Sequence, residues 1–239
     1  PAERYRVDKE AAHPDAILLR SQDLHAMKIA PSVKAIGRAG AGTNNIPVKQ
    51  MSARGVPVFN APGANANAVK ELVLAGMLIA ARNLAPALEF VRAIKGEDEA
   101  LANRVEEGKK QFAGIELPQH TLGIIGLGKI GSLVADAAIH LGMNVLGFDP
   151  EITVDAAWSL PAQVKKAHSI DEVLKASHFV TLHVPLLPQT RNLVNAKNLE
   201  LVRAGTILLN FSREGIVDSA AVVEALAANR LKYYVTDFP

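Results

Sequence analysis

The 239-residue sequence contains no cysteine. Without thiols the chain can form no disulfide scaffold, no thiolate zinc site and no cysteine nucleophile. It also carries little net charge, +2, and no run of Lys or Arg longer than two residues, which argues against a basic nucleic-acid-binding face. A hydrophobic fraction of 49% and a charged fraction of 21% indicate a globular protein with a substantial core.

Neither a long apolar segment nor a secretory leader is visible in the sequence. The apolar stretch around Leu72 ends at Arg82, which is too short to cross a bilayer and favours a buried helix. The N-terminus is charged and polar, unlike a signal peptide. We therefore expect a soluble, cytoplasmic protein without a membrane partner. Since the chain begins at Pro1 and stops at Pro239 in a loop-like context, we also expect it to be part of a longer protein.

Predicted strands and helices alternate along the chain, which is typical of an α/β fold with parallel sheets. Residues 60–67, rich in Asn, Pro and Gly, predict a loop and a domain junction. Pro86 is expected to break the long helix, and residues 95–111 form a solvated helix or loop. The predicted strands are 16–19, 33–36, 56–59, 121–125, 144–148, 163–167, 179–183, 206–210 and 233–236, and the helices are 48–53, 68–92, 130–141, 169–175, 196–202 and 219–228.

Residues 126–131 read Gly-Leu-Gly-Lys-Ile-Gly, a G-x-G-x-x-G pattern. The pattern follows a predicted strand and opens a predicted helix, which is the context that a dinucleotide fingerprint requires. Gly126 would permit a tight turn, Gly128 would let the backbone approach a pyrophosphate, and Gly131 would let the helix pack closely on the sheet. The free amides at the start of the helix, at Lys129 and Ile130, would face the anion.

The strand after this helix ends at Asp149, 18 residues beyond Gly131. A carboxylate at this point accepts hydrogen bonds from the adenosine ribose and repels a 2′-phosphate. The sequence therefore predicts NAD, rather than NADP, as the cofactor.

Four segments of the chain resemble the D-isomer-specific 2-hydroxyacid dehydrogenases. Residues 37–46 (GRAGAGTNNI) resemble the family's substrate loop, and residues 122–131 its nucleotide motif. Residues 183–194 resemble a second cofactor-side segment, and residues 209–218 (LNFSREGIVD) the segment that bears the catalytic arginine. Within the family, the likeness is greatest to the members that oxidise 3-phosphoglycerate.

The resemblance implies a fold of two Rossmann-like domains, each with a doubly wound parallel sheet, and a cleft between them. Residues 1–65 would form the N-terminal, flavodoxin-like part of the substrate-binding domain, and residues 66–239 the NAD-binding Rossmann domain. The C-terminal return segment of the substrate domain is expected to lie outside the sequence. The family also implies a homodimer or homotetramer built through the nucleotide domain, with the apolar helix at 72–85 as a candidate interface.

Hydride transfer between NAD and a 2-hydroxy acid needs a group that holds the substrate carboxylate and polarises the carbonyl. Arg213 is the candidate for both roles, because a guanidinium is always charged and offers a planar fork of donors. In the family a glutamate and a histidine complete the set, and we expect both beyond Pro239. His183 is expected beside the cofactor rather than as the proton donor. The other histidines show no spacing with carboxylates that suits a metal, so no metal site is predicted.

Further site residues follow from the resemblance. Arg20 and Ser21 resemble the pair that meets the substrate phosphate, to which fork donors and a hydroxyl are suited. Ala41 and Gly42 would offer backbone amides to the carboxylate, and Asn65 a further substrate contact. The cofactor-binding residues would be Gly126, Gly128, Lys129, Ile130, Gly131, Asp149, His183, Val184, Pro185, Thr190, Phe211, Ser212 and Asp237.

The function that this resemblance implies is the NAD-dependent oxidation of D-3-phosphoglycerate to 3-phosphohydroxypyruvate, the entry to serine biosynthesis. Two alternatives stay open. One is a glyoxylate or hydroxypyruvate reductase, or another D-2-hydroxyacid dehydrogenase, without a phosphate site. The other is a non-enzymatic, NAD-sensing binding protein similar to the transcriptional corepressors that share this fold.

Overall fold

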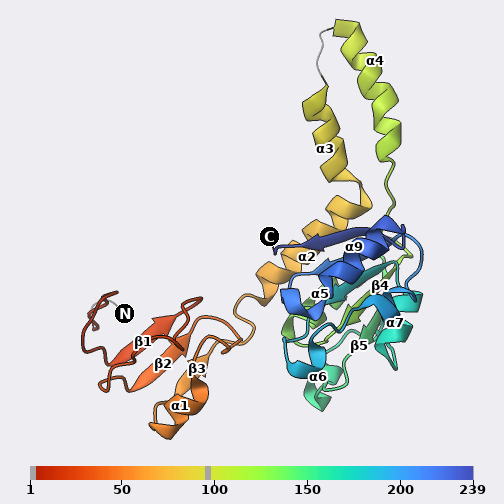
Figure 1. Ribbon diagram of the computed structural model, residues 1–239. Helices are drawn as coiled ribbons and strands as arrows, with labels where there is room; N and C mark the ends of the chain where they lie inside the picture. Colours follow the sequence, from red (N-terminus) through yellow and green to blue (C-terminus); the bar gives the residue numbers. More distant parts are fainter. Residues whose placement is uncertain (1–3, 95–97, 239) are drawn as a thin grey trace. The chain divides into compact units, whose positions relative to one another are not determined.

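The computed structural model describes residues 4–94 and 98–238, and the chain divides into two compact units, Pro1–Asn65 and Ala66–Pro239 (Figure 1). Each unit contains a parallel sheet, which confirms the predicted α/β class. The substrate-binding role of the first unit stays a prediction. Residues 95–97, the first part of the segment predicted as a solvated helix or loop, lie outside the described residues.

The first unit is a three-stranded parallel sheet in the order β1-β2-β3. Its elements are β1 (Ala16–Leu19), β2 (Ala35–Arg38), α1 (Val48–Ala53) and β3 (Val58–Asn60). The second strand begins two residues later than predicted, because Val33 and Lys34 precede the pairing with β1. The core of the unit is small and consists of Leu24, Val33, Ile36, Ile46, Met51 and Val56.

The second unit holds a six-stranded parallel sheet in the order β6-β5-β4-β7-β8-β9. The strand order reverses between β4 and β7, and it is at such a switch point that doubly wound sheets bind dinucleotides. The strands are β4 (Thr121–Ile125), β5 (Asn144–Phe148), β6 (Lys165–Lys166), β7 (Phe179–Leu182), β8 (Thr206–Asn210) and β9 (Leu231–Thr236). The helices are α2 (Ala66–Ala81), α3 (Leu84–Ala93), α4 (Asp98–Lys109), α5 (Lys129–His140), α6 (Val154–Trp158), α7 (Ile170–Ala176), α8 (Ala196–Leu199) and α9 (Ser219–Ala227), with the 3₁₀ turns η1 (Lys110–Phe112), η2 (Pro188–Thr190) and η3 (Glu214–Ile216).

Helices cover both faces of this sheet. Successive side chains of a strand point to opposite faces, so neighbouring residues enter different cores. Ile124 and Leu209 join the core that contains α2 and α5, whereas Ile125 and Leu208 join the core that contains α7 and α9. Strands buried on both faces are held in place along their length, and so are the loops that leave their carboxyl ends.

The long predicted helix does not break at Pro86. α2 ends at Ala81, and α3 starts at Leu84 after a bend of 61°. Asn83 makes the bend with φ +51°, a left-handed conformation that asparagine tolerates. Pro86 lies in the first turn of α3, where its missing amide would have had no helical partner. The prediction that the helix breaks was therefore right, but the break lies at Asn83 and not at Pro86.

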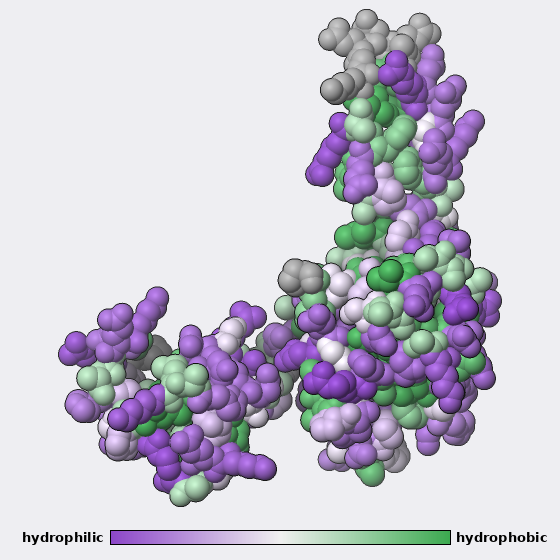
Figure 2. All heavy atoms as spheres, in the orientation of Figure 1, coloured by the Kyte–Doolittle hydropathy of each residue, from purple (hydrophilic) through white to green (hydrophobic). Residues whose placement is uncertain are grey.

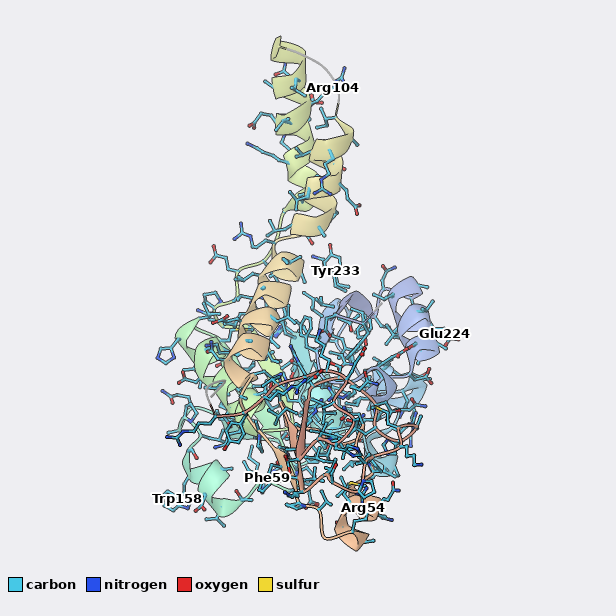
Figure 3. The ribbon with its side chains drawn as sticks, turned by 90° about the vertical axis from the view of Figure 1, so that its left-hand side faces the viewer. Arg54, Phe59, Arg104, Trp158, Glu224 and Tyr233 are labelled. Atoms are coloured by element: carbon cyan, nitrogen blue, oxygen red, sulfur yellow. The ribbon has the colours of Figure 1, made fainter. Side chains whose placement is uncertain are left out.

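Asn83 is buried, and its side chain ties the bend to the rest of the unit. Its Nδ2 donates to the Ala113 carbonyl at 2.8 Å, and its Oδ1 accepts a bond of 2.8 Å from the Tyr233 hydroxyl. Tyr233 lies at the foot of the paired helices α3 and α4, which project from the sheet as an arm (Figure 3). The bend is thus set by β9, far along the chain.

The described part of the arm is helical, which agrees with the solvated helix expected after residue 95. Phe90 of α3 packs on Phe112 of η1 with ring centroids 5.3 Å apart. Among the described residues no single helix is long and apolar enough to span a membrane. Taken together, α2 and α3 would be long and apolar enough, but they are bent by 61° relative to each other. Two smaller predictions were wrong: α6 was not expected, and α8 ends at Leu199 rather than at residue 202.

Candidate cofactor and substrate site

The turn after β4 can hold only glycine at its first position. Gly126 has φ +95°, which side chains disfavour, and a Cβ there would lie 2.6 Å from the His183 carbonyl oxygen. A Cβ at Gly131 would collide with the Gly126 carbonyl oxygen. These contacts bring the ends of β4 and β7 and the first turn of α5 close together at the switch point.

The start of α5 is open. Gly128 is the N-cap, and within the part of the chain that the structure describes no side chain caps the helix and a Cβ added to Gly128 would meet no atom within 4 Å. The first amides of a helix have no partner within it, so those of Lys129 and Ile130 are available to an anion. Ser132 folds back instead, its hydroxyl donating to the Gly128 carbonyl at 2.8 Å.

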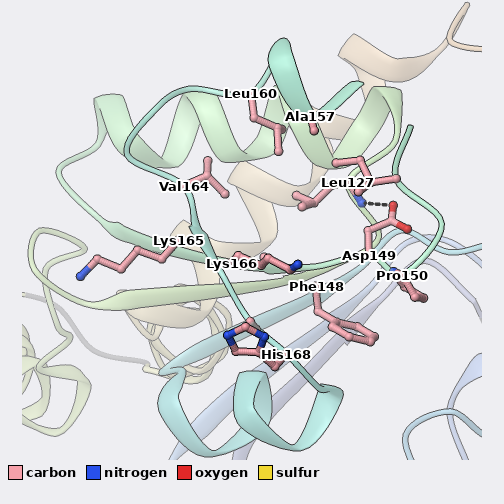
Figure 4. A pocket seen from close by; sticks show the side chains of 13 residues that line it. Leu127, Phe148, Asp149, Pro150, Ala157, Leu160, Val164, Lys165, Lys166 and His168 are labelled. Atoms are coloured by element: carbon pink, nitrogen blue, oxygen red, sulfur yellow. Dashed lines mark hydrogen bonds between the residues drawn. The ribbon is translucent and has the colours of Figure 1, made fainter. Parts of the chain in front are cut away.

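Asp149 follows β5 and is anchored by backbone amides. Its Oδ2 accepts a 2.8 Å bond from the Leu127 amide, and its Oδ1 accepts a 3.0 Å bond from the Glu151 amide. Figure 4 shows the carboxylate at the rim of a cavity, with the bond to Leu127 dashed. Each carboxylate oxygen keeps a lone pair for a further donor, such as a ribose hydroxyl.

A cavity of about 480 Å³ lies beside this carboxylate (Figure 4). Such a volume is in the range of small-molecule sites. Apolar side chains supply most of its wall, and Lys165, Lys166 and His168 supply its polar groups. The apolar members are Leu127, Phe148, Pro150, Ile152, Ala157, Leu160, Val164 and Ala167. An aromatic base attached to a ribose at Asp149 would fit this wall.

His183 follows β7, and its ring nitrogens face inward although part of the residue is exposed. Nε2 shares a hydrogen bond of 3.0 Å with the Thr181 hydroxyl, and Nδ1 is buried without a partner in the described part of the chain. Burial lowers the pKa of His183 to about 4. The imidazole is therefore neutral near pH 7, which argues against a role as an acid that donates a proton there.

The loop after His183 is closed by Thr190. The Thr190 hydroxyl donates to the Pro185 carbonyl at 2.6 Å and accepts a bond of 2.7 Å from the Leu187 amide. This hydroxyl thus holds the loop together. Val184 packs against the Gly126 turn, 3.0 Å from the position of a Gly126 Cβ.

Arg213 lies just beyond β8, and its side chain is exposed. The Nη1 atom donates to the Ser212 carbonyl at 2.6 Å, and the outer donors of the guanidinium have no partner among residues 4–94 and 98–238. The residue lines a second cavity of about 670 Å³ together with Arg191 and Glu214. Asp218 lines it as well, so two guanidinium groups and two carboxylates share this cavity wall.

Other predicted residues near Arg213 turn their side chains inward. Phe211 packs against the core beneath α2, close to Gly76. Ser212 donates its hydroxyl to Asn210 Oδ1 at 2.9 Å. Both residues therefore offer a cofactor mainly backbone atoms, whereas Asp237, after β9, is exposed.

In the first unit, Arg20 directly follows β1 and is exposed. Its carbonyl accepts a 3.2 Å bond from Asn45 Nδ2, and that nitrogen also donates to the Gln22 carbonyl at 2.8 Å. Asn45 thereby joins the segment after β1 to the end of the glycine-rich loop. Arg20 and the start of this loop, Ala39, line a shallow cavity of about 470 Å³.

The other predicted substrate residues of this unit lie in its loops. The Ala41 carbonyl accepts a 2.7 Å bond from Asn60 Nδ2, which fixes the loop against the end of β3. Gly42 follows in the same loop, Ser21 is exposed next to Arg20, and Asn65 lies in the turn before α2. Their roles in substrate binding stay predictions.

Comparison with known proteins places this geometry in a family. Residues 74–239 match the model of the D-isomer specific 2-hydroxyacid dehydrogenase NAD binding domain. The chain belongs to this family. NAD is accordingly the cofactor of the matched domain.

Three relatives illustrate the range of the similarity. The D-3-phosphoglycerate dehydrogenase of Methanocaldococcus jannaschii is 38% identical over 208 residues, 87% of this chain and 37% of the relative. The hydroxypyruvate reductase of Thermotoga maritima is 34% identical over 200 residues, 84% of this chain and 60% of the relative. The holo form of Rhodotorula graminis D-mandelate dehydrogenase is 26% identical with a TM-score of 0.76, covering 87% of this chain and 59% of that structure. The chain thus spans less than two thirds of each relative.

The described residues of this dehydrogenase domain fit NAD. An uncapped helix start faces the open space at Gly128, where a pyrophosphate can approach the backbone. Asp149 offers acceptors to ribose hydroxyls, and the cavity beside it has the size and apolar wall that an adenine needs. The cofactor supplies the hydride acceptor when it is bound.

Sequence reasoning missed one residue that shapes the dehydrogenase site. Asn210, fully buried at the end of β8, donates to the Arg213 carbonyl at 2.9 Å and to the Tyr234 hydroxyl at 3.3 Å. Its Oδ1 accepts the Ser212 amide at 3.2 Å. A buried amide that makes four hydrogen bonds to three residues fixes the turn that presents Arg213, so Asn210 is a positioning residue. The available signal was an asparagine that ends a strand directly after three apolar residues.

Proposed function

We propose that the protein oxidises D-3-phosphoglycerate to 3-phosphohydroxypyruvate with NAD. The observation that carries this proposal is the exposed guanidinium of Arg213 at the carboxyl edge of the NAD-binding sheet, on a turn that Asn210 fixes through the Arg213 backbone carbonyl. Similarity to several proteins named D-3-phosphoglycerate dehydrogenase, such as those from Methanocaldococcus jannaschii and Archaeoglobus fulgidus, supports the choice of substrate. The reaction would supply the precursor of serine biosynthesis.

In this proposal Arg213 binds the substrate carboxylate and polarises the oxygen on the reacting carbon. Its outer guanidinium donors can make the paired bonds that a planar carboxylate prefers. The bound cofactor would supply the hydride acceptor, and the hydroxyl proton would pass to a base. His183 is a poor candidate for this base, because its buried imidazole already shares Nε2 with Thr181. A glutamate–histidine pair, as the family resemblance implies, stays the prediction for proton transfer.

Arg20 is the proposed phosphate ligand. In the described part of the chain its guanidinium makes no hydrogen bond or ion pair, so all its donors are available. Ser21 adds a hydroxyl next to it. A charge-assisted fork of donors is suited to a phosphate dianion, and an unphosphorylated substrate would leave it unused.

The second candidate function is a hydroxypyruvate or glyoxylate reductase. The 34% identity to the hydroxypyruvate reductase of Thermotoga maritima favours it. The two candidates differ in the need for a phosphate site and therefore in the role of Arg20. A third candidate, an NAD-sensing binding protein, would bind the cofactor without turning over either substrate.

The deciding experiment measures NADH formation by the full-length protein with 3-phosphoglycerate and with D-glycerate. We expect steady turnover of 3-phosphoglycerate and, for Arg20→Ala, a KM for this substrate raised about tenfold or more, since a charge-assisted bond is worth about 1.5–3 kcal/mol. The KM for D-glycerate should change little. Lys49→Ala, which removes an exposed cation from α1, is the matched control and should leave both values unchanged.

Equal effects of Arg20→Ala on both substrates would refute the phosphate assignment. Turnover of hydroxypyruvate or glyoxylate without turnover of 3-phosphoglycerate would favour the reductase. NADH binding without any turnover would favour the sensor.

We also propose that the protein is a homodimer or homotetramer assembled through α2 and α3. Hydrophobic side chains cluster along these helices and the foot of the arm (Figure 2). The most exposed of them in α3 are Leu88, 56%, and Val91, 60%. Exposed apolar side chains that lie together on a surface are typical of protein interfaces. Sedimentation equilibrium should give a mass that is a multiple of the protomer, and a monomer at micromolar concentration would contradict the proposal.

A further inference from the structure

The cavity beside Asp149 contains two lysines that the binding of NAD does not require. Lys165 and Lys166 form β6, the edge strand of the six-stranded sheet, and both line the cavity. A doubly wound site uses an acidic residue for the ribose 2′-hydroxyl of NAD, and a basic residue for the 2′-phosphate of NADP. This cavity is lined both by an acidic residue, Asp149, and by two basic residues, Lys165 and Lys166.

The register of β6 separates the two lysines. Lys165 pairs with Leu146 and Lys166 with Gly147, and successive side chains of a strand point in opposite directions. Figure 4 shows Lys165 leading away from Asp149, and the Lys166 ammonium directed to the side of the cavity where Asp149 lies. Lys166 is therefore the lysine that faces the ribose position.

Lys166 is also free to take a ligand. Its side chain is exposed and makes no hydrogen bond or ion pair in the part of the chain that the structure describes, including none with Asp149. Asp149, in contrast, is held by the Leu127 and Glu151 amides. The carboxylate thus has a fixed position, and the ammonium can move on its long side chain.

We propose that Lys166 is a specificity-determining residue that can bind a ribose 2′-phosphate, and that the charge of Asp149 alone keeps NADP out. Removal of this charge then converts the NAD site into one that accepts NADP without any added cation. The inference concerns the cofactor pocket and is independent of the proposed substrate.

The test measures binding of NADPH and NADH by fluorescence titration, with no substrate present. Asp149→Asn removes the charge but keeps an oxygen that can accept the Leu127 amide bond. We expect this variant to bind NADPH about tenfold more tightly than the wild type, as charge-assisted contacts to phosphate allow. Adding Lys166→Met to Asp149→Asn should abolish most of the gain in NADPH affinity. Adding Lys165→Met instead is the matched control and should change the NADPH affinity of Asp149→Asn less than about threefold.

NADH affinity in the Asp149→Asn background serves as the internal control for the integrity of the pocket. It should be the same, within about threefold, with and without either lysine substitution. The proposal is overturned if Asp149→Asn gains no NADPH affinity, if the two lysine substitutions reduce it equally, or if Lys166→Met weakens NADH as much as NADPH. Because no turnover is measured, failure here is distinct from failure of the proposed substrate.

Discussion

The two parallel sheets of the molecule differ in how completely they are buried. Every residue of β7 and β8 in the six-stranded sheet is buried, and helices cover both faces. In the three-stranded sheet, β1 alternates between exposed and half-buried residues, with Leu18 85% exposed. A sheet with both faces packed fixes the loops at its strand ends, whereas a small sheet with an open face adds little stability of its own.

The polar residues at the strand ends follow the same division. Asp149 and Asn210, in the six-stranded unit, are held by backbone hydrogen bonds. Arg20, in the three-stranded unit, is exposed with an unpaired guanidinium in the described structure. The cofactor-binding residues of the six-stranded unit are therefore preorganised, and the proposed phosphate ligand of the three-stranded unit depends on a flexible side chain. Substitutions in the two units should accordingly separate into effects on cofactor binding and effects on substrate affinity.

A substitution of Arg213 tests this difference between the units most directly. Arg213 has an exposed side chain, although it belongs to the six-stranded unit, whose sheet is packed on both faces. Arg213→Ala should lower kcat/KM about a thousandfold, since the proposed carboxylate binding and carbonyl polarisation would both be lost. The melting temperature and the affinity for NADH should stay close to those of the wild type, because among the described residues the side chain donates only to the neighbouring Ser212 carbonyl. Steady-state kinetics and thermal unfolding measure the two effects.

Arg213→Lys provides the control for charge. A lysine keeps the charge but loses the planar fork, so most of the activity should still be lost. Full activity of the lysine variant would show that Arg213 acts only as a charge. A large fall in melting temperature in the alanine variant would show that Arg213 supports the fold instead.

A pair of glycine substitutions compares the two units directly. Gly126→Ala should destabilise the six-stranded unit by about 3 kcal/mol, through its positive φ and the close His183 carbonyl. Gly55→Ala, at φ +69° with no neighbour within 4 Å of its Cβ, should cost the first unit about 1 kcal/mol. NADH affinity should fall about tenfold or more in the first variant and not in the second. Equal losses of stability would contradict the close contact at the switch point.

The local parts of the fold were predictable from the sequence. The first strand of the nucleotide unit, its glycine turn, α5 and β5 were predicted within one residue, because apolar periodicity and glycine spacing are properties of neighbouring residues. The position of Asp149 at the end of β5 followed from the same motif. These features need no information from distant parts of the chain.

Features that depend on distant contacts were not predictable. The bend at Asn83 is fixed by Tyr233, 150 residues away, so proline alone pointed to the wrong residue. The role of Asn210 arises from Arg213 and Tyr234 together, and only the folded turn shows it. The position of Lys166 near Asp149 likewise requires the pairing of β5 with β6. A pattern in the sequence indicates an element, whereas its partners come from the tertiary structure.

The smallest expected effect concerns His183, which lies at the end of a fully buried strand. Burial lowers the pKa of His183 to about 4, below the value near 6.5 that the ring has in the unfolded chain. Between these values the unfolded state binds a proton that the native state does not, so stability falls as the pH drops below 6.5. From pH 7 to pH 5 this group should cost about 2 kcal/mol of unfolding free energy.

Chemical denaturation of the wild type and of His183→Gln between pH 7 and pH 5 measures this slope. The variant should lack the part of the slope that His183 causes. His178, whose pKa burial also lowers, with smaller effects of Arg203 and His120, contributes to both proteins and cancels in the difference. The slope should belong to unfolding of the six-stranded unit, because His183 lies there. Identical slopes in the two proteins would mean that water reaches the ring, and that the end of β7 is less tightly packed than the rest of the sheet.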